Sequence, residues 1–268
     1  MEWKVSKITV MRHFCTLLLA VPLLMLAPVG ARATDLTLLA MDYPPFNTLN
    51  STGEPEGLSV ELVRDMLALA GLKGSVSLYP WLRAYTMTQD NRHACLLSTT
   101  RTPEREALFQ WVGPLYDNPW VLYAPRALAP RIRSLEDARP YRIAGFEGSA
   151  AAAYLVKKGF RVEYARDDLD NFTKLQAGRV DLWLTGRLQA EALMARRPDA
   201  APLEPRITVR TTQLYLACNR NMPLTMVQRL QRALTQLARE NRPYIIAHRY
   251  LDRLRLRTQP ALDPWSRR

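Results

Sequence analysis

Short strand-like segments alternate with amphipathic helical segments along most of this 268-residue chain. The segment 36–41 is a short apolar run with strand character. The segment 57–71 has leucine and methionine at helical spacing and ends in Gly71, a suitable C-terminal cap. Alternation of this kind predicts a sheet of mostly parallel strands with helices on its faces. The segment order therefore indicates the α/β class.

The alternating segments form two blocks. In the first block we expect strands at 36–41, 75–79, 94–100 and 120–124, and helices at 57–71 and 82–89. In the second block we expect strands at 141–146, 161–165 and 180–185, and helices at 149–159, 167–178 and 188–197. A long strand at 207–218 and two amphipathic helices, at 223–240 and 242–251, complete the pattern.

The two blocks predict two lobes. A stretch rich in proline and arginine, 124–134, separates them, and the strand at 207–218 would return the chain to the first lobe. Two strands would then cross the hinge, near residues 124 and 212, and a cleft between the lobes would suit a small molecule. The expected division is 34–124 for the first lobe, 125–212 for the second, and 213–268 for the return and the C-terminal helices.

The N-terminus has the pattern of a secretory signal peptide. A basic stretch precedes the apolar run 14–29, which ends in Ala31-Arg32-Ala33, and we expect cleavage after Ala33. A membrane anchor would need a longer apolar run. Either Met1 or Met11 could be the start. The signal over 1–33 predicts a periplasmic protein.

The charge balance is distinctly basic, with 37 Lys and Arg against 25 Asp and Glu and a formal net charge of +12. Such an excess is compatible with nucleic acid, an anionic surface or an anionic ligand. Export argues against nucleic acid as a partner. An anionic ligand and a solvated, arginine-rich surface both stay open.

Two cysteines follow the predicted signal, Cys95 and Cys218. Both lie on segments that read as core strands. An exported protein can form a disulfide, and two buried thiols fit the same pattern. The sequence leaves both alternatives open.

The motif from Ser98 to Arg105 has the features of an anion site. A strand delivers Ser98 and Thr100 to its end, and Thr102-Pro103 predicts a helix start. The first turn of a helix favours an anion, and Arg105 can bind a carboxylate with two parallel hydrogen bonds. The alternative is a surface helix start with a solvated arginine.

Aromatic residues occupy two other strand ends. Tyr43 and Phe46 flank two prolines after the first strand, and Trp81 follows Tyr79-Pro80. In α/β sheets ligands bind at the carboxyl ends of strands, so these rings could line the cleft. Packing in the core is the alternative for each.

These motifs, in this order, resemble a known family over nearly the whole chain after the leader. They are YPPF (43–46), GLSVEL (57–62), PWLRA (80–84), LLSTTRTPERE (97–106), FQWVGPLY (109–116), GFEGSAAAAYL (145–155), AGRVDLWLTG (177–186) and QLYLACNRN (213–221). The chain resembles the periplasmic solute-binding proteins of family 3, the amino-acid-binding components of ABC importers. The resemblance implies a two-lobed type II periplasmic-binding (Venus-flytrap) fold that closes on its ligand.

The resemblance also implies a set of ligand-binding residues. They are an arginine for the ligand carboxylate, polar donors beside it, aromatic walls and a helix N-terminus of the second lobe. In this chain they match Arg105, Ser98, Thr100, Tyr43, Trp81, Gly148, Ser149 and Ala150.

One position departs from the family pattern. An acidic residue that holds the ligand ammonium is common after the strand 180–185, where this chain has Gly186. Ser59 likewise stands where an acidic residue is common. Glu147 or Asp117 could supply the missing charge, whereas Asp181, at the strand start, is expected to be structural.

We therefore expect a monomeric binding protein that takes a small carboxylate-bearing solute, an amino acid or a related compound. It would deliver the solute to an ABC permease in the inner membrane. We expect no cofactor, no metal and no enzymatic activity. One alternative is a periplasmic dehydratase-like enzyme with Glu147 as its acid, since His93 and His248 are expected to be structural. Another is an accessory protein that reports a ligand to a receptor.

Overall fold

The computed structural model describes Met1 and residues 35–253. Apart from Met1, the predicted signal peptide lies outside the described residues, as do the last 15 positions, 254–268. No helix in the described part is both long and apolar enough to cross a membrane.

Eight strands form one sheet, and a two-stranded ribbon stands apart from it. In spatial order the eight strands are β4 (Gly74–Leu78), β1 (Leu36–Ala40), β5 (Ala94–Thr100), β10 (Leu203–Asn219), β6 (Phe109–Pro125), β9 (Leu182–Gly186), β7 (Ile143–Phe146) and β8 (Val162–Ala165). The ribbon pairs β2 (Thr48–Leu49) with β3 (Pro55–Glu56).

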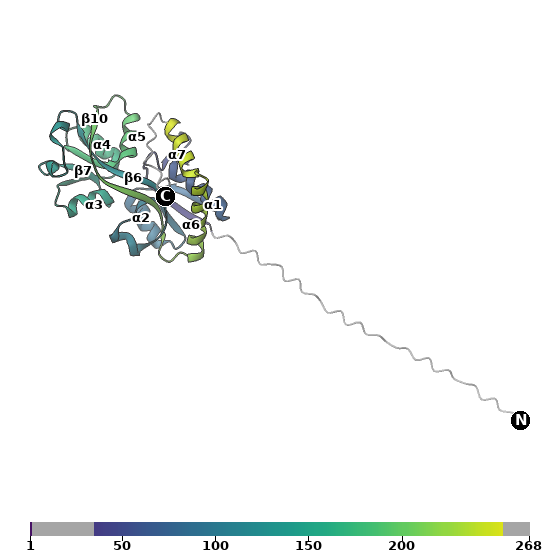
Figure 1. Cartoon of the computed structure of the whole chain (residues 1–268). Helices are drawn as coiled ribbons and strands as arrows, with labels where there is room; N and C mark the ends of the chain where they lie inside the picture. The colour runs from purple at the N-terminus through teal and green to yellow at the C-terminus, as the bar shows by residue number, and fades with distance from the viewer. Residues whose placement is uncertain (2–34, 254–268) are drawn as a thin grey trace. The chain divides into compact units, whose positions relative to one another are not determined.

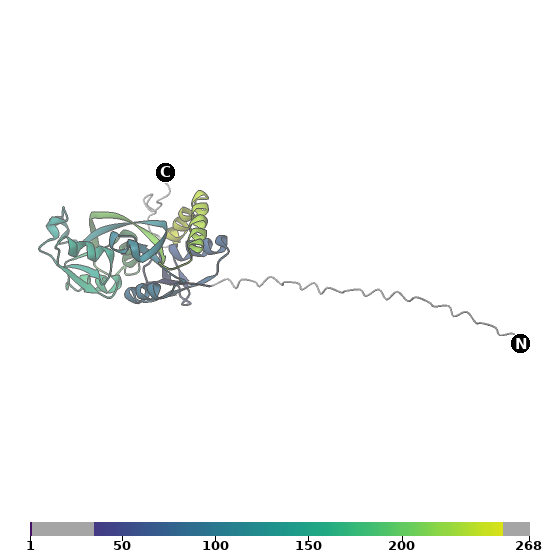
Figure 2. The same ribbon diagram turned by 90° about the horizontal axis from the view of Figure 1, so that it is seen from below.

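The helices gather at the two ends of the long strands β6 and β10 (Figures 1 and 2). The first lobe carries α1 (Leu58–Ala70), α2 (Trp81–Asp90), α6 (Leu224–Arg239) and α7 (Arg242–Arg253). The second lobe carries α3 (Ala150–Lys157), α4 (Asp168–Gln176) and α5 (Arg187–Ala195). Short 3-10 turns are η1 (Pro103–Leu108), η2 (Ala129–Arg131) and η3 (Glu136–Ala138).

Strand direction follows the lobes. Within the first lobe β1 pairs in parallel with β4 and β5, and within the second lobe β7 pairs in parallel with β8 and β9. The strands β6 and β10 run antiparallel to their neighbours, because each carries the chain from one lobe to the other. The α/β class and the two-lobed type II architecture with two crossing strands are thus confirmed. Each crossing strand is longer than predicted.

Each lobe has its own apolar core. In the first lobe one cluster combines β1 and β5 with the buried faces of α1 and α6, including Leu38, Leu62 and Leu230. In the second lobe two clusters lie against different sets of sheet residues, one around Leu182 and the other around Trp183. Alternating side chains of β9 point to opposite faces, so one strand serves both clusters. The first-lobe cluster also includes Leu188 of α5, so the cores of the two lobes meet at this residue.

The helix predicted to start at Thr102 is only a short 3-10 turn. Pro103 occupies its first position as expected, but Thr102 makes no side-chain cap hydrogen bond. The turn ends at Leu108 because β6 begins at once with Phe109. The expected anion site at an α-helix N-terminus is therefore absent here.

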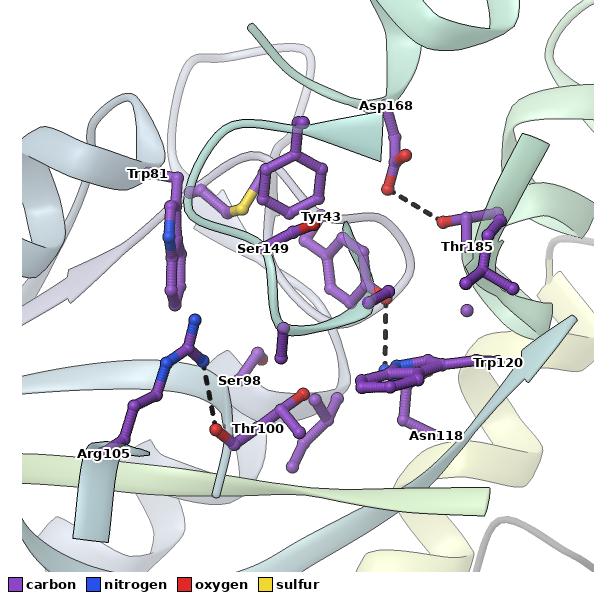
Figure 3. A pocket seen from close by; sticks show the side chains of 17 residues that line it. Tyr43, Trp81, Ser98, Thr100, Arg105, Asn118, Trp120, Ser149, Asp168 and Thr185 are labelled. Carbon is purple, nitrogen blue, oxygen red and sulfur yellow. Dashed lines mark hydrogen bonds between the residues drawn. The ribbon is translucent and has the colours of Figure 1, made fainter. Parts of the chain in front are cut away.

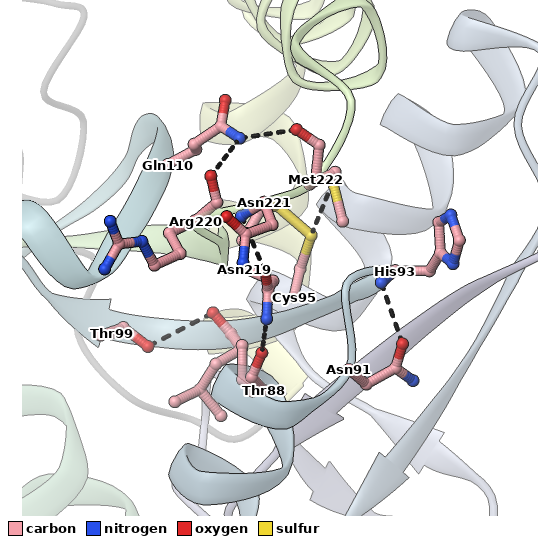
Figure 4. The surroundings of a disulfide bond; sticks show 12 residues. Thr88, Asn91, His93, Cys95, Thr99, Gln110, Asn219, Arg220, Asn221 and Met222 are labelled. Carbon is pink, nitrogen blue, oxygen red and sulfur yellow. Dashed lines mark hydrogen bonds between the residues drawn. A yellow bond between two sulfur atoms is a disulfide. The ribbon is translucent and has the colours of Figure 1, made fainter.

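Cys95 and Cys218 form a disulfide between β5 and β10 (Figure 4). The two residues face one another in the antiparallel register, and both side chains are fully buried. Met222 Sδ lies 3.9 Å from Cys95 Sγ and covers the bridge. The disulfide joins positions 123 residues apart and fixes the return strand to the first lobe.

Reduction of this disulfide should lower the free energy of unfolding. For a loop of this length, loop-closure entropy gives an upper estimate of about 5 kcal/mol. Denaturant unfolding with and without dithiothreitol measures the change. The double variant Cys95→Ala/Cys218→Ala is the control, because dithiothreitol should have no effect on it. Equal stability of the oxidised and reduced protein would contradict the expectation.

Candidate functional site

One small cavity, of about 50 Å³, collects side chains from both lobes and from the crossing strands (Figure 3). We call it the inner cavity. Its polar and aromatic lining residues are Tyr43, Trp81, Ser98, Thr100, Arg105, Asn118, Trp120, Ser149, Asp168 and Thr185. Seven of the eight residues expected from the sequence line it: Tyr43, Trp81, Ser98, Thr100, Arg105, Ser149 and Ala150. The eighth, Gly148, contacts two of these through its backbone.

Arg105 is a half-buried cation. Its guanidinium lies over the rings of Trp81 and Tyr85, 5.1 and 5.6 Å from their centroids, and donates to two backbone carbonyls. Burial lowers its pKa. Among residues 35–253 no carboxylate forms an ion pair with it. Partial burial of a charge without a counter-ion is unfavourable, so the site favours an anion.

The Gly148 carbonyl is where the first lobe contacts the second. It accepts hydrogen bonds from Trp81 Nε1 at 3.0 Å and from an Arg105 terminal nitrogen at 2.7 Å. Gly148 has φ +74°, and an added Cβ would collide with Trp81 and Leu82. Glycine is therefore required for this close approach. Ser149 then caps α3 by accepting from the Ala152 backbone amide at 3.0 Å.

Ser98 belongs to a buried hydroxyl network of the first lobe. Its Oγ donates to Asn47 Oδ1 and lies 3.0 Å from Ser59 Oγ. Ser59 is fully buried, so a hydroxyl there contributes to the network without adding a buried charge. The network fixes the end of β5, from which Thr100 and then Arg105 reach the inner cavity.

Tyr43 fills the space beside Gly186. Its ring stacks on Phe46, with centroids 5.5 Å apart, and its hydroxyl accepts from Asn118 Nδ2 at 3.3 Å. A Cβ on Gly186 would collide with both Tyr43 Oη and Asn118 Oδ1. Tyr43 and Asn118 leave no room for a side chain at position 186, which explains why no acidic residue stands there. Asn118 Oδ1 is buried and has no hydrogen-bond partner among the described residues.

Asp168 supplies a carboxylate to the same cavity, and it was not among the residues predicted from the sequence. It lies at the start of α4, is only 2% exposed, and accepts from Trp183 Nε1 and Thr185 Oγ1, both at 2.8 Å. Burial raises its pKa to about 6 despite these hydrogen bonds. Figure 3 shows Asp168 on the opposite side of Tyr43 from Arg105. The cavity is therefore bipolar.

The acidic residues and histidines weighed from the sequence lie elsewhere. Asp117 and Glu147 each line a hollow outside the inner cavity, and Asp181 pairs with Arg142 at 3.0 Å. His93 and His248 do not line the inner cavity. Within residues 35–253 no group of three His, Cys, Asp or Glu side chains could hold a metal ion.

One segment of the chain matches a known protein family. Residues 37–130 match the family model described as bacterial extracellular solute-binding proteins, family 3. This range contains Tyr43, Trp81, Ser98, Thr100 and Arg105. No curated protein sequence matches the chain.

Solved structures with low sequence identity share the fold. A histidine kinase sensor domain with similarity to periplasmic binding proteins matches with TM-score 0.76 and 20% identity, over 82% of this chain and 97% of that one. The arginine-, lysine-, histidine-binding protein ArtJ from Geobacillus stearothermophilus gives 0.73 and 16%, over 82% and 99%. The ancestral amino acid-binding protein AncCDT-1, a precursor of cyclohexadienyl dehydratase, gives 0.69 and 17%, over 81% and 94%. The segment 37–130 is thus similar to family 3 of the bacterial extracellular solute-binding proteins, and the chain shares its fold with these solved structures.

Proposed function

We propose that the chain binds a small carboxylate-bearing solute, an amino acid or a related compound, in the inner cavity. The observation that carries this proposal is the half-buried Arg105, which has no carboxylate partner among the described residues. A ligand carboxylate would neutralise it and could bind by two parallel hydrogen bonds. The N-terminus of α3, capped by Ser149, supports the same anion from the second lobe.

The opposite end of the cavity supports a hydrogen-bond donor on the ligand. Asn118 Oδ1 is a buried acceptor without a partner in the described part of the chain, and Asp168 brings a negative charge nearby. An ammonium group would satisfy both, since it offers three donors and a positive charge. Asp168 would thus replace the acid missing at Gly186. Trp81 and Tyr43 would form the walls around the ligand.

The similarity to family 3 and the shared fold support a cellular role for this binding. The chain would act in the periplasm as the binding component of an ABC importer, closing on its ligand and delivering it to an inner-membrane permease. Closure of this kind is a population shift driven by contacts made with both lobes. The similarity to a kinase sensor domain supports ligand sensing as the second candidate role. Pull-down with the permease or receptor encoded nearby distinguishes the two.

A thermal-shift panel tests ligand binding itself. The purified protein without its leader is screened against amino acids, amino-free carboxylates, short peptides, polyamines and sugars. A ligand at about 100 times its dissociation constant adds about 2.7 kcal/mol of stability, which the melting temperature reports. We expect the largest shifts among amino acids. Stabilisation by sugars or polyamines alone would contradict the proposal.

Arg105→Ala should weaken binding of the best ligand from that panel at least about 30-fold. Truncating one partner of a buried charged pair costs about 2–5 kcal/mol. Arg105→Lys should restore only part of the affinity, because lysine lacks the planar fork. Isothermal titration calorimetry gives the affinities, and Arg92→Ala, an exposed arginine before β5, is the matched control. Full affinity in Arg105→Ala would remove the anchor role.

Binding of an amino acid should weaken as the pH falls below about 6. In the folded protein Asp168 is protonated below its raised pKa of about 6. An ammonium favours the ionised form, so binding must release the proton and affinity should fall by up to tenfold per pH unit. Calorimetry at pH 7.5 and 5.0 measures this dependence.

Two controls belong to the pH experiment. Asp168→Asn should remove the pH dependence, because an amide does not titrate in this range. An amino-free carboxylate analogue should bind the unaltered protein without loss of affinity at pH 5.0. If amino acid affinity is equal at the two pH values, Asp168 has only a structural role.

A further inference from the structure

A second, much larger hollow is also lined by Arg105. We call it the outer cavity; its volume is about 1180 Å³, against about 50 Å³ for the inner one. The two cavities share Thr100, Arg105, Trp120 and Ala150. A ligand anchored at Arg105 can therefore extend from the inner cavity into the outer one.

Both lobes and one crossing strand build the outer cavity. The turn η1 forms one wall, α3 the opposite wall, and β10 contributes residues 210–213. On α3 the lining residues are Ala150, Ala153, Tyr154 and Lys157, which share one face of the helix at spacings of three and four. The two alanines leave space near the anchor, whereas the basic residues lie at the far end of the helix.

The charged residues that line the outer cavity are mainly basic. It contains Arg101, Arg105, Lys157, Lys158 and Arg210, against Glu104 and Asp117 as the acidic residues. Two of the basic side chains are already paired, Arg101 with Glu106 and Lys157 with Glu104.

Two cations that line the outer cavity have no ion-pair partner among the described residues. Lys158 and Arg210 form no ion pair within residues 35–253. Arg210 lies over the face of Tyr154, with its guanidinium carbon 5.9 Å from the ring centroid. Tyr154 in turn packs on Trp120, which fixes this wall. Lys158 and Arg210 therefore bring positive charge to the outer cavity without an ion-pair partner in the described part, whereas Lys157 is paired with Glu104.

We propose that the outer cavity is a distal anion subsite of the same binding site, and that the ligand is an elongated amino acid with a second anionic group. The first carboxylate would lie on Arg105 and the distal one between Lys158 and Arg210. From Ala150, which lines both cavities, to Lys158 the helical rise is about 12 Å. This inference rests on the function proposed above and adds the ligand's length and second charge.

A matched pair of probes tests the subsite. 2-Aminosuberate and 2-aminooctanoate share the same amino acid head and chain length, and only the first carries a distal carboxylate. Calorimetry on the unaltered protein should show at least tenfold tighter binding of 2-aminosuberate. Added salt should reduce this advantage, since the distal contacts are partly exposed.

Variants then assign the advantage to the two cations. Lys158→Gln/Arg210→Gln should bind both probes equally, with the affinity for 2-aminooctanoate unchanged. Lys73→Gln/Arg92→Gln removes two exposed positive charges elsewhere in the first lobe and should keep the advantage of 2-aminosuberate. This control separates a local subsite from the overall charge of the protein.

The outcomes separate the two proposals. If neither probe binds while the panel yields an Arg105-dependent ligand, or if both bind equally to the unaltered protein, the distal subsite is wrong and the carboxylate site stands. An advantage that persists in Lys158→Gln/Arg210→Gln also overturns the subsite. If no carboxylate binds, or Arg105→Ala keeps full affinity, the proposed function itself fails.

Discussion

The antiparallel pairing of β6 with β10 is the interaction on which the rest of the structure depends. Its register extends from Leu203 opposite Pro125 to Asn219 opposite Phe109, so the two strands stay paired through both lobes. On one side β10 pairs with β5, and on the other β6 pairs with β9. The ends of β5 and β9 are thereby brought to one cleft. Register shifts within this pair provide places where the two strands can bend.

The charges of the site follow from this arrangement. Arg105 reaches the cleft from the first lobe, and Asp168 reaches it from the second. Neither is paired with the other, and Tyr43 lies between them (Figure 3). A zwitterion of matching polarity would compensate both charges in a single binding event, which is a physical reason for the lobes to close on it. The outer cavity adds a third charged region, of the same sign as Arg105.

Gly186 lies in the inner cavity at a position where the family resemblance predicts an acidic residue. In the sequence this glycine aligns with a position that is commonly acidic in the family. In the fold, the Tyr43 hydroxyl and Asn118 occupy the space where a side chain would project. A carboxylate instead reaches the cavity from Asp168, 18 positions earlier. Helix α4 packs against β9 through Trp183 and Thr185, and these hydrogen bonds orient that carboxylate.

The sequence by itself determined the helices and strands and the motif from Ser98 to Arg105. Apolar periodicity located the strands and helices, because burial of one face is a local pattern. The positions of Tyr43, Trp81, Ser98 and Arg105 at or just after strand ends were enough to predict that these residues meet in one cleft. The pattern also implied two lobes, because two alternating blocks were followed by a return strand.

Only the tertiary structure decided what depends on distant segments meeting. The disulfide required β5 and β10 to pair in one register, whereas the sequence was equally compatible with two buried thiols. The role of Asp168 depended on α4 docking against β9, and the outer cavity on α3 facing η1 across the cleft. The motif at Thr102 looked like an α-helix start, but β6 begins too soon for one. Such features depend on which side chains lie opposite one another after folding, and local patterns do not contain that information.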